Sequence, residues 1–459
     1  MSLLAHPAVR SAVDLLSAWI ESQMAYAGQP GLSIGIVHDQ ELVWAAGFGR
    51  ADAERGRPAT PDTLYRIASI TKLFTSTAIL QLRDAGRLQL DDPVVKHLPW
   101  FAIGQPHADA PVTTIRHLLT HTAGLPREAG FPYWTDGDFP TIEQIRERLP
   151  RQTAALPPES EWKYSNLGLT VAGEIVAAVS GRPYADYIVQ HVLEPLGMKR
   201  TFVTTPPAEH PDLAVGYTRR LPARGRTPAP HTDGRGITAA ANMTTCVTDL
   251  ARFAMLHFRD AAVGGAQILK TTTLREMQRP HWVEPDWTAG WGLGFRIVRQ
   301  NGKTLVGHGG SLRGYRTQLQ LCPADRIGVV VLTNADDGNP VQYTDKVFQW
   351  VGPAILKATA PAAPAAPAGW ERYAGKYRNA WGDAQVLLLD GRLAVIDPSV
   401  PDPLATVSWL VPAGEHTFRL ETKNGFGNNG EPVVFELDDA GRVRRVKVGE
   451  NFLTPLESW

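Results

Sequence analysis

Residues 66–82, RIASITKLFTSTAILQL, combine a polar start with a long apolar run that predicts a buried helix. Ser69 is followed three residues later by Lys72, and a helix beginning near Ser69 puts both side chains on one face. A serine hydroxyl is a weak nucleophile until a base lies beside it, and a desolvated lysine can be that base. The helix N-terminus also supplies backbone N–H groups for an oxyanion. Ser-x-x-Lys alone is common, however, and serine at a helix start is often only a cap.

The charge balance and cysteine content limit the partners and the compartment. The 459 residues include 46 Lys plus Arg and 46 Asp plus Glu, so no overall field attracts nucleic acid or an anionic membrane. No stretch approaches the roughly 18 uninterrupted apolar residues of a spanning helix. Cys246 and Cys322 alone imply no disulfide framework, as is usual in a reducing compartment. We therefore expect a cytoplasmic protein with no nucleic-acid partner and no membrane partner.

The flanking segments predict a sheet built from both ends of one domain. Apolar residues recur at helical spacing from Val9 to Met24, with acidic residues between them, which predicts an amphipathic helix rather than a secretory signal. Strand patterns follow at residues 31–37 and 42–49 and return at residues 304–308, 315–321 and 327–332. We expect these five strands to form one sheet, with a last helix over residues 341–356.

The middle of the chain predicts a helical subdomain with long loops, the kind of segment on which sites are often built. Helical patterns are found at residues 114–119, 141–149, 167–179 and 247–258. Loops rich in proline separate the first three of these segments.

Residues 358–369 are almost all Ala and Pro and predict a semi-rigid linker. We therefore expect one domain over residues 1–357 and a second over residues 370–459. Short alternating runs in the second domain predict a small antiparallel barrel, at residues 385–389, 392–396, 416–422, 433–437 and 443–448. The predicted fold class is α/β (α+β), an antiparallel sheet flanked by helices with a helical subdomain, followed by this barrel.

Two further stretches carry groups that suit the chemistry of Ser69. Tyr164 and Asn166 stand where a loop meets a helix, so a phenol that relays a proton and an amide that orients a substrate would share a cavity. The sequence from His308 through Gly309 and Gly310 to Ser311 ends a strand, where glycines let a substrate approach and the next backbone N–H is free. Each stretch alone is more often simple packing or a glycine-rich turn.

Together and in this order, the three stretches resemble the motifs of the serine β-lactamase and penicillin-binding-protein superfamily. They are similar to Ser-x-x-Lys, Tyr-x-Asn and Lys-Thr-Gly of class C β-lactamases and D-alanyl-D-alanine carboxypeptidases. Supporting similarity lies at residues 117–125, 194–198 and 239–243, and the resemblance covers about residues 10–355. It implies a sheet flanked by helices, with the site between the sheet and the helical subdomain.

The resemblance also implies roles for individual residues. Ser69 would attack a carbonyl to form an acyl-enzyme, and Lys72 and Tyr164 would remove its proton and pass it to the leaving group. Asn166 would bind the substrate, and the backbone N–H groups of Ser69 and Ser311 would hold the oxyanion. Water would then release the acyl group.

One motif departs from the β-lactamase pattern. His308 and Gly309 stand where true β-lactamases keep Lys and Thr, which suit a substrate carboxylate. His-Gly-Gly resembles instead the esterases and D-aminopeptidases of the superfamily, so efficient β-lactam hydrolysis is not expected. The last 90 residues (370–459) resemble, by composition and placement, the lipocalin-like barrels appended to some of these peptidases. We expect the loop at residues 424–430 to lie in solvent.

A metal site is the competing interpretation, because His117 and His121 are four residues apart and would share a helix face. No glutamate of the zincin pattern lies between them and no third ligand is evident, so we expect no metal and no cofactor. A further alternative is a penicillin-binding sensor that is acylated without efficient turnover, or a true β-lactamase or carboxypeptidase. We expect a serine hydrolase acting on an ester or amide of a small molecule or peptide. The C-terminal domain would be the contact surface if the chain forms a homo-oligomer.

Overall fold

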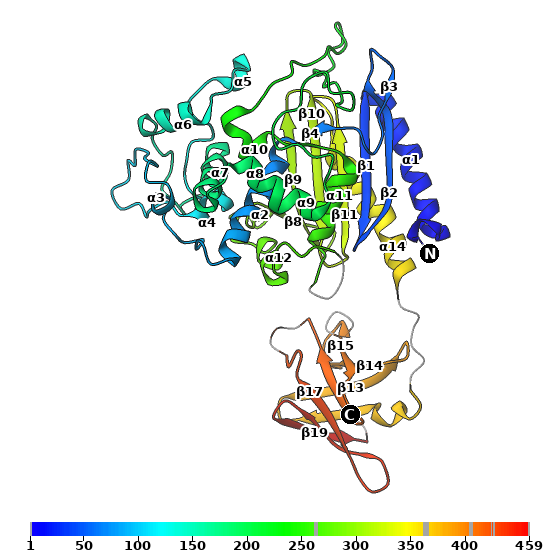
Figure 1. The fold of residues 1–459 in the computed structure, drawn as a ribbon. Helices are drawn as coiled ribbons and strands as arrows, with labels where there is room; N and C mark the ends of the chain where they lie inside the picture. Colours follow the sequence, from blue (N-terminus) through cyan, green and yellow to red (C-terminus); the bar gives the residue numbers. More distant parts are fainter. Residues whose placement is uncertain are drawn as a thin grey trace. The chain divides into compact units, whose positions relative to one another are not determined.

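Figure 1 shows the chain as a computed structural model, which describes residues 2–260, 265–360, 367–403, 407–423, 425 and 427–457. The chain divides into two compact units, Met1–Ala358 and Thr359–Trp459. In the described part of the chain, no helix is both long enough and apolar enough to cross a membrane.

The first unit is built on a nine-stranded antiparallel sheet with the order β3-β2-β1-β11-β10-β9-β8-β7-β6. Its strands are β1 (Gly31–His38), β2 (Glu41–Asp52), β3 (Arg57–Pro58), β6 (Trp282–Val283), β7 (Ala289–Trp291), β8 (Arg296–Gln300), β9 (Lys303–Leu312), β10 (Tyr315–Cys322) and β11 (Ile327–Thr333). A separate two-stranded pair joins β4 (Tyr65–Arg66) to β5 (Thr244–Thr245). Strand β1 pairs with β11, Ile34 opposite Val331, so the early hairpin and the late strands share one sheet.

Helices cover both faces of this sheet (Figure 1). They are α1 (Pro7–Ala27), α2 (Thr71–Asp84), α3 (Val94–His97), α4 (Ile115–Thr120), α5 (Tyr133–Asp136), α6 (Ile142–Arg148), α7 (Asn166–Ser180), α8 (Tyr184–Ile188), α9 (Glu194–Leu196), α10 (Thr238–Ala241), α11 (Val247–Leu256), α12 (Thr271–Met277), α13 (Pro340–Lys346) and α14 (Gly352–Thr359). Strand β11 is buried on both faces: Val329 and Val331 pack with α1 and the last helices, and Val330 and Leu332 belong to the core around α2 and α11. This alternation follows from the two-residue period of a strand.

Helix α1 confirms the amphipathic pattern of the sequence, because its buried residues are Val9, Val13, Leu16, Ile20 and Met24. Helix α2 is different, since nearly every side chain from Thr71 to Leu80 is buried. It contacts α7 and α10, and this central helix therefore fixes the position of the residues at its start.

The second unit is a closed eight-stranded antiparallel barrel. Its strands are β12 (Gly375–Asn379), β13 (Gly382–Leu389), β14 (Arg392–Ile396), β15 (Ser408–Pro412), β16 (Thr417–Glu421), β17 (Pro432–Leu437), β18 (Val443–Val448) and β19 (Asn451–Leu456). The core centres on Tyr373, Leu393, Phe418 and Phe435. Closure removes the exposed edges that a small open sheet would leave.

The predicted fold class is confirmed, with differences in detail. A tight 3-10 turn, Ala68–Ile70, precedes α2, which begins at Thr71 rather than near Ser69. Nine strands were not anticipated, β3–β8, β12, β15 and β19, because most are short or lack clear alternation. The predicted last helix is divided by a wider helical turn, Val347–Val351. Residues 361–366 of the predicted linker, and Asn424 and Phe426 of the predicted loop, lie outside the described residues.

Candidate active site

Ser69 lies in the 3-10 turn ahead of α2, and the turn is held tightly against the sheet. Ala68 before it adopts a left-handed φ of 48°, a conformation that costs free energy for a residue with a Cβ. The Thr317 hydroxyl donates to the Ile67 carbonyl at 3.2 Å. A Cβ on Gly310 would lie only 2.1 Å from the same carbonyl oxygen, so β9 requires glycine here. The sheet thus fixes the strained turn and with it the Ser69 hydroxyl.

Lys72 is fully buried one helical turn beyond Ser69. Its Nζ lies 3.1 Å from Ser69 Oγ, 2.8 Å from Asn166 Oδ1 and 2.9 Å from the Ala240 carbonyl oxygen. Burial holds the pKa of the Lys72 amine well below its usual range. A neutral amine has two N–H donors, and the two acceptor-only oxygens of Asn166 and Ala240 use both. The lone pair is therefore left to accept the Ser69 proton.

Tyr164 closes the other side of the Ser69 hydroxyl. Burial raises the pKa of its phenol, and a hydrogen bond with Ser69 offsets part of that rise. Lys72 Nζ lies 4.8 Å from the centre of the phenol ring, and the Arg127 guanidinium lies 5.0 Å from it. The ring also packs on His121, with the two ring centres 4.4 Å apart. Tyr164 therefore remains a protonated phenol beside both Ser69 and Lys72.

Asn166 is the first residue of α7, and both ends of its amide are engaged by protein groups. Oδ1 accepts from Lys72, and Nδ2 donates to Glu128 Oε1 at 2.8 Å. Glu128 also accepts from the Tyr133 hydroxyl and pairs with Arg127 at 3.2 Å. In this arrangement Asn166 orients the Lys72 amine. The role in substrate binding implied for Asn166 would require one of these bonds to open.

The end of β9 supplies a second backbone N–H near Ser69. A two-residue turn joins β9 to β10, and the pair next to it is Leu312 with Tyr315. In such a hairpin the closing pair exchanges hydrogen bonds and the next pair does not. That next pair is Ser311 with Arg316, so the Ser311 N–H points away from β10. It borders the same cavity as Ser69, as the predicted oxyanion role requires.

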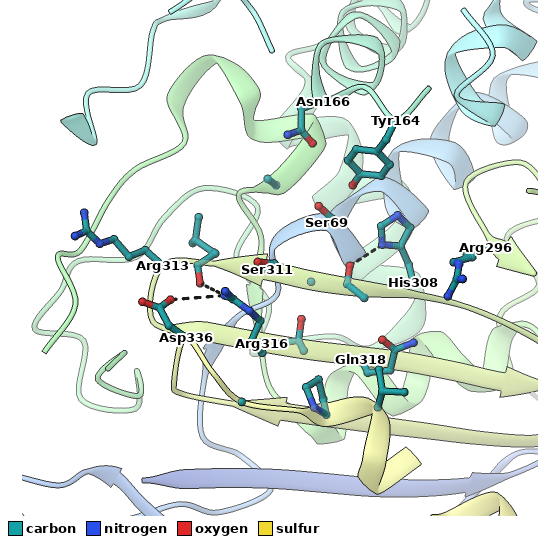
Figure 2. Close-up of a pocket in the computed structure, with 18 of the residues that line it drawn as sticks. Ser69, Tyr164, Asn166, Arg296, His308, Ser311, Arg313, Arg316, Gln318 and Asp336 are labelled. Carbon is teal, nitrogen blue, oxygen red and sulfur yellow. Dashed lines mark hydrogen bonds and ion pairs between the residues drawn. The ribbon is translucent and has the colours of Figure 1, made fainter. Parts of the chain in front are cut away.

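His308 faces this cavity as a neutral acceptor. Its Nδ1 lies 2.6 Å from the Gly309 carbonyl oxygen and so carries the proton that it donates there (Figure 2). Its Nε2 is buried and makes no hydrogen bond within the described chain. Burial lowers the pKa of the imidazole to about 3. His308 therefore offers a substrate the lone pair of Nε2, and not the positive charge of the lysine that β-lactamases have at this position.

Buried neutral histidines should make the first unit sensitive to acid. Burial lowers the pKa of His257, like that of His308, from 6.5 to about 3. The unfolded chain takes up the proton near pH 6.5 and the folded chain does not, so the free energy of unfolding falls as the pH drops from 6.5 toward 3. Replacing His257 with Gln should remove about 2 kcal/mol of the stability lost between pH 7 and pH 5, as measured by urea unfolding. The same change at exposed His107 should leave that loss unaltered.

A cavity of about 1130 Å³ surrounds these groups. Figure 2 shows His308 and Arg296 on one side of Ser69, and Arg313 and Asp336 on the opposite side. Sequence reasoning missed most of the charged and aromatic lining, which is Arg127, Glu128, Trp134, Trp162, Arg219, Trp291, Arg296, Arg313, Arg316 and Asp336. Arg127, Trp162 and Arg313 each lie two residues from a stretch singled out in the sequence, and the others come from segments with no local signal for the site.

His117 and His121 have separate partners rather than a shared ligand. His117 Nε2 lies 3.0 Å from Glu159, whereas His121 Nδ1 accepts the Ser165 N–H at 3.2 Å. No group of three or more His, Cys, Asp or Glu side chains in the described ranges is arranged to hold a metal ion. His121 instead supports the ring of Tyr164.

The chain also contains a Gly-x-Ser-x-Gly sequence at residues 31–35. In α/β-hydrolases this pattern forms an exposed turn between a strand and a helix. Here Ser33 lies fully buried within β1, and its hydroxyl donates to the Thr60 carbonyl at 2.8 Å. It cannot act as an exposed nucleophile.

Comparison with known proteins finds relatives of one family. The model of the family described as Beta-lactamase matches residues 16–351. A Dictyostelium discoideum protein, "Beta-lactamase-like protein 2", is 30% identical over 71% of this chain and 59% of its own length. Several Staphylococcus aureus proteins named "Protein flp" are 27–28% identical over 73% of the chain. The chain thus spans about 59–65% of the length of these curated relatives.

Two solved structures extend the comparison. The octameric penicillin-binding protein homologue from Pyrococcus abyssi is 28% identical, covers 96% of this chain and 99% of its own, and has a TM-score of 0.65. The D-amino acid amidase from Ochrobactrum anthropi, solved with D-phenylalanine, is 25% identical, with a TM-score of 0.62. It covers 76% of this chain and 98% of its own.

Proposed function

This chain belongs to the beta-lactamase family, and we propose that it is a serine hydrolase that cleaves ester or amide bonds through an acyl-enzyme on Ser69. The observation that carries the proposal is the contact of Ser69 Oγ with a buried amine, Lys72 Nζ, at 3.1 Å. Burial lowers the pKa of that amine, which makes the neutral form that can accept the serine proton more available than in an ordinary lysine.

Each step has a group in place. Lys72 takes the Ser69 proton as the hydroxyl attacks the substrate carbonyl. The N–H groups of Ser69 and Ser311 stabilise the oxyanion, a contribution that typically changes rates by about 10²–10³ for each donor. Tyr164, kept protonated by its raised pKa, gives its proton to the leaving group and regains one from the protonated Lys72. Water then attacks the acyl carbon and gives its proton to the neutral Lys72, which returns a proton to Ser69 Oγ as the acyl group leaves.

The neutral state of His308 supports substrates other than penicillins. A β-lactam or a peptide C-terminus presents a carboxylate next to the leaving group, and an uncharged acceptor there offers it no ion pair. Arg296 on β8 lines the cavity on the same side of Ser69 as His308 (Figure 2), but as an exposed, solvent-screened charge it is worth less to that carboxylate than a lysine held within the motif itself. Esters and amides that lack this carboxylate are therefore the favoured class, with amino-acid amides included because of the amidase relative.

One substrate panel tests the proposal. We expect the chain to turn over p-nitrophenyl butyrate or a D- or L-aminoacyl p-nitroanilide at least about 100-fold faster, by kcat/KM, than a chromogenic cephalosporin. A stoichiometric burst without steady turnover would indicate a sensor that is acylated and not deacylated. Preferred hydrolysis of the cephalosporin would overturn the substrate assignment and leave the nucleophile in place.

We also propose that the full-length chain self-associates. The Pyrococcus homologue that aligns with nearly the whole chain is described as octameric. Light scattering on the full-length protein measures the assembly, and a monomer at micromolar concentration would contradict the proposal.

A further inference from the structure

The end of the cavity at the β9–β10 turn carries an excess of positive charge. Arg313 lies at the turn, Arg316 on β10 and Arg219 on a neighbouring loop, and all three line the cavity. Asp336 is the carboxylate at this end, and it accepts the Gly314 N–H at 2.7 Å. Three arginines and one aspartate therefore line this end of the cavity, which leaves an excess of positive charge.

The three arginines are not equivalent. Arg316 is held in place, because it donates to the carbonyl oxygens of Leu312 and Tyr315 and lies 3.6 Å from Asp336 (Figure 2). Arg219 and Arg313 are exposed and have no hydrogen bond or ion pair within the described residues. Two guanidinium groups at this end are thus available to an anion.

A buried arginine adds to the same potential. Arg66 is 2% exposed, and its guanidinium donates to the Thr232 carbonyl and to Asn242 Oδ1, with no carboxylate in ion-pair range in the described chain. It lines a smaller cavity of about 200 Å³ that shares Leu312 and Arg313 with the main one. Asp233 interacts with this charge from outside ion-pair distance, and the part of the charge that Asp233 does not offset favours an anion on the other side of this wall.

The catalytic groups determine which part of a substrate reaches this end. A leaving group must lie beside its proton donor, Tyr164, whose ring centre is 6.1 Å from that of His308. The oxyanion lies between the N–H groups of Ser69 and Ser311. The acyl chain therefore extends from Ser311 toward Arg313. Two residues of extended strand cover about 7 Å, so an acyl chain of roughly four methylene groups would span this distance.

From this juxtaposition we infer that the enzyme prefers substrates whose acyl group ends in a carboxylate, bound by Arg313 and Arg219 at the β9–β10 turn. The inference rests on the proposed function and narrows its substrate class to monoesters or monoamides of dicarboxylic acids. Arg316 is a positioning residue that, with Asp336, fixes the turn on which Arg313 stands.

Two p-nitrophenyl esters of equal chain length test the inference, the monoester of adipic acid and the ester of hexanoic acid. They differ only in a terminal carboxylate or methyl group. Changing Arg313 to Gln should lower the adipate-to-hexanoate ratio of kcat/KM about three- to fivefold, and changing it to Glu should lower the ratio further, because exposed ion pairs contribute at about this level. Raising the salt concentration should lower the ratio of the unaltered protein as well. The matched control, Arg224→Gln, alters an exposed arginine outside the cavity and should leave the ratio within about twofold.

A second measurement needs no turnover. Two fluorophosphonates, one with a carboxybutyl chain and one with a pentyl chain, report the rate of Ser69 modification alone. The same three- to fivefold fall in their rate ratio is expected for Arg313→Gln. Labelling of Ser69 by both probes at a ratio that Arg313→Glu does not change would overturn the subsite and leave the hydrolase proposal standing. Absence of Ser69 labelling by either probe would overturn both.

Discussion

Replacing Ser69 with alanine should reduce kcat/KM for every substrate of the panel by about 10⁴-fold or more and abolish labelling by a fluorophosphonate. The expected size follows from the loss of the covalent route, since removal of a nucleophile of this kind leaves only the acceleration from binding and oxyanion stabilisation. Ser69 Oγ is only half-buried, and truncation opens little space, so the fold should survive. Thermal unfolding of the variant should therefore match that of the unaltered protein.

A neighbouring serine provides the control. Ser160 is exposed on the loop before Tyr164, and its hydroxyl donates to the Pro157 carbonyl at 2.8 Å. Alanine at this position should leave turnover and labelling within about twofold, because a surface hydroxyl outside the cavity contributes little. Labelling that persists in the Ser69 variant, traced to another residue by mass spectrometry, would refute the assignment of the nucleophile.

The residues that could be found from the sequence are those in short local patterns. Ser69 and Lys72 share one helical turn, and Tyr164 and Asn166 share the start of another, so spacing alone places each pair together. The presence of β1 and β11 in one sheet could also be predicted, because both ends of the first unit have strand patterns and an antiparallel sheet can pair strands that are distant in the sequence.

The contacts between distant segments could not be predicted from the sequence. The amide of Asn166 is shared between Lys72 and Glu128, and Glu128 comes from a loop 38 residues earlier. Arg219 and Arg313 line the same cavity, although Arg219 lies on a loop more than 90 residues earlier in the chain. Exposed charges of this kind have no hydrophobic period, and one sequence gives no means of pairing them.

The closed barrel illustrates a different limit. Five of its eight strands have clear alternation, whereas β12, β15 and β19 contain turn-like or charged residues such as Pro455. Closure nevertheless depends on β12 and β19, which pair Lys376 with Leu456. A strand that gains its stability from its neighbours rather than from its own residue pattern cannot be predicted from its own residues.

The pH dependence of turnover should identify Lys72 as the base. The enzyme needs the neutral amine, and the pKa of Lys72 lies well below its ordinary value of 10.5, so kcat/KM should rise with pH through that lowered pKa and be level well before pH 10.5. The pKa of Tyr164 lies above its ordinary value of 10.0, so deprotonation of the phenol should not lower the rate below about pH 10. The profile should thus be a broad plateau with no falling limb in that range.

Variants at the two positions separate their roles. Lys72→Met should lower kcat/KM by about 10³–10⁴-fold at every pH and remove the acidic limb, since no titrating base remains. Tyr164→Phe should lower it by about 10²–10³-fold, keep the limb set by Lys72 and still allow slow fluorophosphonate labelling. Met at position 72 leaves Asn166 Oδ1 and the Ala240 carbonyl unpaired, so unfolding must be measured alongside. If turnover in the unaltered protein kept rising tenfold per pH unit up to about pH 10, Lys72 would have to be charged at neutral pH, and it could not be the base.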